Sequence, residues 1–196
     1  MSTYNQSSIA LDKPTLALWG IRAIAFQVLL IAAAVVLPVV SHLFGAPVRF
    51  LLPMHWPVIL AGLVYGWRAG ILTGALAPIV SYFLSGLPLP NILPSMTVEL
   101  LTYGLVTGLL RELVRFNPFF SVAIALVLGR IVFILSVRFG TSVTTSHLDY
   151  FRAALTPGII AAFLQIALLP FLAKWWIRQE RRTRKNNCED TNEHRH

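Results

Sequence analysis

Long stretches of this chain carry almost no charge, and that feature constrains its fold more than any other. Residues 15–44, 52–69 and 101–110 are apolar nearly throughout. Residues 174–185, by contrast, hold six basic side chains. Of all 196 residues, 56% are hydrophobic and only 12% are charged, which is too little polar surface for a soluble globule of this size. We therefore expect an integral membrane protein.

The apolar runs divide into six predicted helices, so the expected fold class is an all-α membrane protein with six transmembrane helices. Crossing a bilayer takes roughly 20 helical residues, and the three prolines of residues 86–94 exclude a continuous helix there. The expected helices cover residues 16–43, 54–65, 69–84, 95–113, 119–139 and 151–176, joined by loops that include 45–53, 86–94 and 140–149. The second helix is too short to cross alone, so it is either extended by its flanks or protected inside the bundle. The boundary between the second and third helices stays open.

Six helices place both termini on one side of the membrane, and the basic residues indicate which side. Cytoplasmic segments carry an excess of Lys and Arg. With both termini cytoplasmic, the inner segments hold Lys13, Arg22, Arg68, Arg111, Arg115 and the basic tail, whereas the outer loops hold only Arg49, Arg138 and Arg152. A count of five or seven helices would put Arg111 and Arg115, or the tail, on the wrong face.

This topology divides the chain into three expected parts. Residues 1–15 form a cytoplasmic N-terminal segment, residues 16–177 a six-helix transmembrane domain, and residues 178–196 a basic and then polar cytoplasmic tail. We expect the last residues of the tail to be solvated and disordered. Cys188, His194 and His196 lie there, but nothing fixes their geometry, so we expect no metal site. The net charge of +8 belongs to the flanks of apolar spans, and we expect no nucleic-acid partner.

Glycines recur at four-residue intervals in the middle of the chain. Small residues four apart clear one face of a helix, so that another backbone can approach closely in lipid. The pattern comprises Gly62, Gly66, Gly70 and Gly74, and then Gly104 and Gly108. Two interpretations stay open, namely packing within the bundle and docking of a partner helix. Gly66 also lies at the expected turn between the second and third helices.

Two charged residues lie inside predicted spans. A charge at the centre of a bilayer costs roughly 2.5–3.5 kcal/mol on insertion scales, so such residues face the bundle interior, pair, or serve a site. Glu99 lies in the fourth span and Arg130 near the middle of the fifth. Either the two side chains neutralise each other, or one or both contact a polar ligand.

Further polar and aromatic residues gather in the outer half of the predicted spans. The candidate substrate-binding residues are His42, Arg49, Met54, His55, Trp56, Glu99, Tyr103, Arg130 and Gln165. A single membrane histidine is more often structural than functional, but this clustering predicts an outward-facing pocket, lined by aromatic side chains and suited to a ring-bearing solute.

Several catalytic motifs are absent from the sequence. There is no G-x-x-x-x-G-K-[ST], so the chain cannot hydrolyse ATP by a P-loop, and neither G-x-S-x-G nor H-E-x-x-H occurs. We therefore expect no enzyme activity and no cofactor bound by this chain.

Four sequence runs follow one another in the apolar middle of the chain. The run VVLPVVSHLFG is followed by FLLPMHWPVILAGLVYG, then by GLPLP and MTVELLTYGLVTGLL. In order and spacing these residues resemble the substrate-binding S component of energy-coupling factor (ECF) vitamin transporters. The closest resemblance is to the branch that shares Pro-Met-His-x-Pro-Val and Glu-Leu-x-x-Tyr-Gly. It covers roughly residues 35–111.

The resemblance implies a six-helix subunit of a bacterial plasma membrane importer. Such a subunit binds a vitamin or cofactor precursor, for example a corrinoid or ribazole, pantothenate or a similar molecule, near the outer face. Its implied partners are a transmembrane coupling protein and two ATPase subunits, which use the ATP, and the S component topples in the membrane to release solute inside. By position, loop 45–53 would be a gate and the pocket would draw on helices four to six.

The sequence departs from the family pattern in two places. Many S components carry an Ala-x-x-x-Ala docking motif in the first helix, which is missing here. A Met-His-Ile start marks nickel and cobalt relatives, where the free N-terminal amine is a ligand. Met54 and His55 are internal, so the nitrogen of Met54 is an amide and a metal site is not expected.

Two other functions remain open. One is a structural or scaffolding membrane protein whose glycine faces bind other helices and whose Glu99 and Arg130 simply pair. The other is an ion-coupled transporter of small solutes that uses Glu99. The substrate and the oligomeric state are left open as well.

Overall fold

The computed structural model describes residues 14–18, 20–43, 52–140 and 147–193. These residues form six α-helices and no strand. In chain order the helices are α2 (Ile21–Leu43), α4 (His55–Tyr65), α5 (Trp67–Ser85), α6 (Leu93–Glu112), α7 (Pro118–Gly140) and α8 (His147–Glu193). Five of them are long and apolar enough to cross a membrane, and α4 is the shorter exception. The predicted all-α membrane class is confirmed.

The surface of the helix bundle is strongly apolar. Large hydrophobic side chains such as Phe83, Phe139 and Phe163 are 80%, 83% and 71% exposed. Soluble monomers rarely expose apolar patches of more than a few hundred Å². The bundle therefore presents its outer face to lipid.

The short helix α4 lies inside the bundle. It contacts α2, α5, α6 and α8, and of its 11 residues only Trp56 is not buried. At about 1.5 Å per residue it would reach only about 16 Å, so it depends on its neighbours for shielding from lipid. Of the two alternatives for this segment, protection inside the bundle is the one observed.

A single residue, Gly66, connects α4 to α5. Its φ of +84° lies in the region that glycine adopts at little cost and other residues avoid. The chain reverses there, so α5 packs back along α4. The turn expected at Gly66 is confirmed.

Glycines bring α5 and α6 into backbone contact. A Cβ added to Gly70 would meet the backbone of Gly104, and one added to Gly104 would meet that of Gly70. In the same way Gly74 faces Leu100, and Gly108 faces the backbone at Trp67. These glycines and Gly62, whose added Cβ would also meet α6, are buried within the bundle. They are not available to a partner helix without unpacking.

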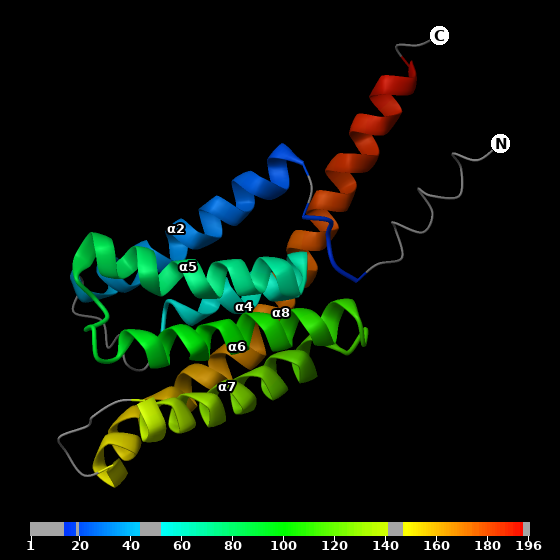
Figure 1. Ribbon diagram of the computed structural model, residues 1–196. Coiled ribbons are helices and arrows are strands. Elements are labelled where there is room, and N and C mark those ends of the chain that lie inside the picture. Colours follow the sequence, from blue (N-terminus) through cyan, green and yellow to red (C-terminus); the bar gives the residue numbers. More distant parts are fainter. Residues whose placement is uncertain (1–13, 19, 44–51, 141–146, 194–196) are drawn as a thin grey trace.

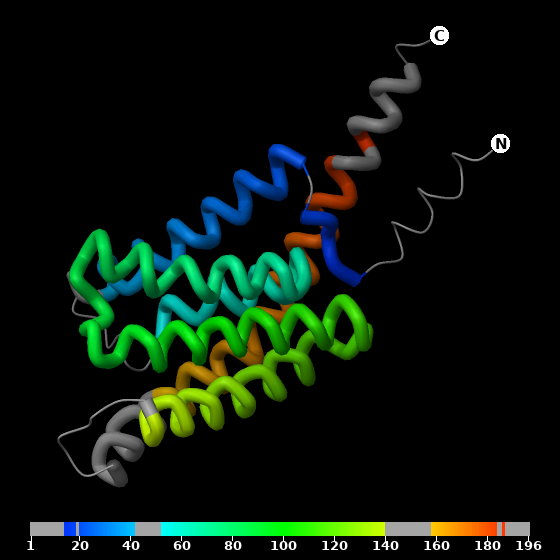
Figure 2. Tube along the Cα trace, viewed as in Figure 1, coloured from blue at the N-terminus to red at the C-terminus, as the bar shows by residue number. Residues whose placement is uncertain are grey.

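The helices alternate in direction, which gives the bundle two distinct ends (Figures 1 and 2). The Gly66 turn, residues 113–117, the start of α2 and the far part of α8 lie at one end, and residues 86–92 lie at the other (Figure 1). The sequence of the segments at the first end contains Arg22, Arg68, Arg111, Arg115, Lys174, Arg178, Arg181 and Arg182. We name it the basic end, and the opposite end, where α5 ends and α6 begins, the Gly86 end.

The N-terminal boundary of the first helix differs from prediction. Helix α2 begins at Ile21 rather than at residue 16. The residues before it are held in a non-helical path, because the Leu16 N–H donates to the Val64 carbonyl at 2.7 Å and Arg111 Nη2 donates to the Pro14 carbonyl at 3.2 Å. Tertiary hydrogen bonds thus override the apolar pattern there.

Two later helices are longer than predicted. Helix α6 begins at Leu93 with Pro94 in its first turn, where the missing N–H of proline costs nothing. Helix α8 begins at His147, inside the expected loop 140–149, and continues to Glu193. The expected disorder of the last tail residues is therefore wrong as far as residue 193, because residues 178–193 contain no Gly or Pro and many strong helix formers. Residues 194–196 lie outside the described residues.

The contact between α5 and α6 predicts a large effect of one added methyl group. Gly104→Ala should lower the free energy of unfolding by about 1–3 kcal/mol, because the helices must separate to admit the Cβ. Thermal unfolding of the detergent-solubilised protein measures this. Val98→Ala, at a position on the same helix that is 42% exposed, is the matched control and should change little. An unchanged melting temperature for Gly104→Ala would contradict the backbone contact.

Candidate functional site

The carboxylate of Glu99 is the centre of a buried polar cluster. Its side chain is only 4% exposed, and its Oε1 accepts a hydrogen bond from the Tyr103 hydroxyl at 2.6 Å. Arg130 Nη1 lies 3.1 Å from the same oxygen, and His55 Nε2 lies 3.8 Å away. Pairing of opposite charges is the usual way in which charges inside membrane spans are accommodated. The first of the two alternatives for Glu99 and Arg130, mutual neutralisation, is therefore present in the structure.

Local structure explains how these side chains meet. Glu99 and Tyr103 are four residues apart and so share one face of α6, while Arg130 comes from α7 and His55 from the first turn of α4. Two glycines provide the space. A Cβ on Gly129 would meet the Tyr103 ring, and a Cβ on Gly158 would meet the Arg130 guanidinium.

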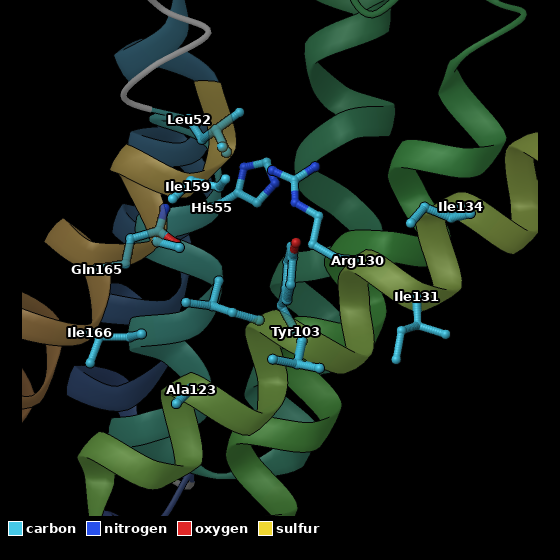
Figure 3. Close-up of a pocket in the computed structure, with 14 residues that line it drawn as sticks. Leu52, His55, Tyr103, Ala123, Arg130, Ile131, Ile134, Ile159, Gln165 and Ile166 are labelled. Carbon is cyan, nitrogen blue, oxygen red and sulfur yellow. The ribbon is translucent and has the colours of Figure 1, made fainter. Parts of the chain in front are cut away.

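A cavity of about 470 Å³ lies beside this cluster (Figure 3). Its polar lining residues are His55, Tyr103, Arg130 and Gln165, and its remaining wall is formed by Leu52, Ala123, Leu126, Val127, Ile131, Ile134, Gly158, Ile159, Ala162 and Ile166. Figure 3 shows the His55 ring, the Tyr103 hydroxyl and the Arg130 guanidinium at one side of the cavity, and Gln165 on a neighbouring helix. The volume falls in the usual range for small-molecule sites.

Two side chains in this cavity lack hydrogen-bond partners among the described residues. Gln165 is fully buried, yet neither its Oε1 nor its Nε2 is bonded, and neither ring nitrogen of His55 is bonded. Gln27 in α2 differs in its amide nitrogen, which donates to the Ala69 carbonyl at 3.1 Å and to Thr73 Oγ1 at 2.5 Å, although its Oε1 has no partner among the described residues either. A buried polar group without a hydrogen bond costs about 1–3 kcal/mol, so the fold leaves the polar atoms of Gln165 and His55 unsatisfied at the wall of the cavity.

The structure brings together five of the nine candidate residues, namely His55, Glu99, Tyr103, Arg130 and Gln165. Met54 is buried in the apolar core and Trp56 packs against that core. Neither lines the cavity. Arg49 and the side chain of His42 lie outside the described residues.

The lining of the cavity differs from the predicted aromatic pocket. Among the lining residues only His55 and Tyr103 carry rings, and most of the wall is aliphatic. The aliphatic residues come largely from one face of α7, at the helical spacing of Ala123, Val127, Ile131 and Ile134. In a membrane helix the lipid face is equally apolar, so this spacing alone could not have identified them.

Sequence reasoning also missed Gly158, which makes room for Arg130. A signal was available, because Pro157 and Gly158 interrupt an apolar run. This signal did not identify a role for Gly158, however, because a Pro-Gly pair equally indicates a bend in the chain.

The buried ion pair predicts strong coupling between its two members. Glu99→Gln and Arg130→Gln should each lower the free energy of unfolding by about 3 kcal/mol, because each leaves the other charge without its partner. The double variant should lose much less than the sum. Chemical unfolding of all four proteins in detergent gives the coupling energy, and additive losses would show that the pair is not formed.

The comparisons with known proteins agree with this picture. Residues 22–175 match the family described as ECF transporter, substrate-specific component. No curated protein and no solved structure matches. The matched segment runs from α2 into α8 and contains every residue of the buried cluster and the cavity. This multi-pass membrane chain therefore belongs to the family of substrate-specific components of ECF transporters.

Proposed function

We propose that this chain is the substrate-capture subunit of an ECF importer and binds a vitamin or cofactor precursor in the cavity. The observation that carries the proposal is the pair of buried side chains, Gln165 and His55, that have no hydrogen-bond partner among the described residues and line a cavity of about 470 Å³. Native proteins leave few buried polar groups unpaired. A solute that hydrogen-bonds to Gln165 and His55 would satisfy the polar atoms that the fold leaves without partners. Members of the family are transporter subunits and not enzymes.

The direction of capture follows from the distribution of charge. Basic residues gather at one end of the bundle, and cytoplasmic segments carry the excess of Lys and Arg. The basic end is then cytoplasmic, with both termini inside and α4 counted as one of six crossings of a bacterial plasma membrane. His55 begins α4 and Glu99 lies in the first half of α6, and both helices start toward the Gly86 end. The cavity therefore receives its solute from outside.

The volume of the cavity bears on which solute is captured. One water takes about 30 Å³ of liquid, so about 470 Å³ holds roughly 15–25 non-hydrogen atoms. A ribazole or pantothenate is of this size, whereas a complete corrinoid is several times larger. The smaller precursors are favoured.

Transport requires partners in this proposal. The sequence has no P-loop, so two ATPase subunits hydrolyse ATP and a transmembrane coupling protein links them to this chain. The glycines of α4, α5 and α6 are occupied by packing within the bundle. The coupling protein therefore docks on another surface.

Two glutamines provide a matched test of capture. Gln165→Leu should raise the free energy of unfolding of the solute-free protein by about 1–2 kcal/mol, because it removes a buried amide without partners. It should also lower affinity for the solute by at least about tenfold. Gln27→Leu should instead lower the free energy of unfolding, since it loses hydrogen bonds of the fold, and should leave the affinity for the solute unchanged, because Gln27 lies outside the cavity lining.

The measurements are thermal unfolding and mass spectrometry of small molecules retained through gentle purification. Wild type and Gln27→Leu should retain a solute that Gln165→Leu loses. If wild-type protein retains no solute and shows no saturable binding to ribazole, pantothenate, folate, riboflavin or thiamine, the proposal is wrong.

The buried carboxylate of Glu99 favours a second candidate, an ion-coupled transporter. Carboxylates at membrane depth serve as proton relays in pumps and transporters. Uptake would then collapse with the proton gradient and survive removal of the ATPase partners. Our proposal requires the opposite pattern.

A further inference from the structure

We infer that the cavity selects an uncharged solute, one that carries hydroxyl or amide groups on a largely apolar body. The inference rests on the proposed capture function and names the chemical class captured. It follows from the charge balance of the buried cluster and from the donors and acceptors that face the cavity.

The ionic groups at the cavity already balance one another. Glu99 contributes one negative charge and Arg130 one positive charge, and their atoms lie 3.1 Å apart. No other Asp, Glu, Lys or Arg lines the cavity among the described residues. A net charge brought into this apolar space would find no uncommitted counter-charge, and burying an unpaired charge is costly.

His55 brings no second carboxylate to the cavity. Its Nε2 lies 3.8 Å from Glu99 Oε1, which is too long for a hydrogen bond. That carboxylate is already paired with Arg130.

A solute carboxylate would have to compete with Glu99 for Arg130. The Arg130 side chain is 21% exposed, while that of Glu99 is 4% exposed, so Arg130 is the more accessible of the two. An incoming anion on Arg130 would nevertheless lie close to Glu99, whose Oε1 lies 3.1 Å from Arg130 Nη1 and accepts a hydrogen bond from Tyr103. That repulsion in a low-dielectric site selects against anions.

The free polar atoms define the complementary groups. Gln165 offers both a donor and an acceptor, and the two ring nitrogens of His55 also have no hydrogen-bond partner among the described residues. The Tyr103 hydroxyl donates a hydrogen bond to Glu99, and its oxygen can still accept one. A hydroxyl or an amide of the solute can both donate hydrogen bonds to these groups and accept hydrogen bonds from them. The aliphatic wall contacts the remaining apolar part of the solute.

Matched pairs of compounds test the inference on the purified full-length protein. Each pair shares one skeleton and differs in charge, such as pantothenol with pantothenate, and ribazole with its phosphate. Isothermal titration should show at least about tenfold tighter binding of the uncharged member, because the anion has no free counter-charge. Equal or tighter binding of the anion would overturn the inference while leaving capture intact. If no member binds and no solute is retained, capture itself fails and this inference fails with it.

Charge variants sharpen the test. Glu99→Gln leaves Arg130 without its carboxylate, so preference should move toward the anionic member by at least about tenfold. The double variant Glu99→Gln/Arg130→Gln is neutral again and should restore preference for the uncharged member. It also keeps the test decisive if Glu99→Gln does not fold. The control is Ser136→Ala, which should leave the preference unchanged. It removes a hydroxyl that donates to the Val132 carbonyl, and Ser136 does not line the cavity. A preference that is unchanged in Glu99→Gln, or still anionic in the double variant, would overturn the inference.

Discussion

A carboxylate that must be buried at membrane depth organises the centre of this protein. Glu99 requires partners there, because lipid offers none. The groups around it come from three helices: Tyr103 on α6 donates a hydrogen bond, Arg130 on α7 forms the ion pair, and His55 on α4 lies 3.8 Å away. Satisfying one oxygen thus sets the relative positions of these helices. The same arrangement leaves one side of the cluster open to the cavity.

Polar side chains inside the bundle fall into two kinds. Gln27 joins α2 to α5 through bonds to Ala69 and Thr73, and its amide nitrogen serves the fold. Gln165 is equally buried but bonds to nothing among the described residues. Two glutamines in similarly apolar helices therefore have different roles. Only the neighbouring helices reveal which is which.

Much of the architecture followed from hydropathy, and much of the site did not. The apolar runs, the turn at Gly66 and the pairing option for Glu99 and Arg130 were all visible in the sequence, because charge and glycine are rare in lipid and so carry information. The extent of α8 was missed, since helix propensity beyond the membrane outweighed the polar composition. The sequence could not show that Trp56 lies outside the cavity or which aliphatic residues line it, because the lipid-facing and inward-facing surfaces of such helices have the same composition.

The backbone contact between α5 and α6 has a mechanical consequence. Gly70 and Gly104 leave no side chain between the two helices, so neither helix can shift without losing close packing along the shared face. Helix α4, enclosed by its neighbours, is equally constrained. This half of the bundle acts as a stiff frame. Any rearrangement that widens the cavity then falls to α7 and α8, whose side chains form most of the opposite wall.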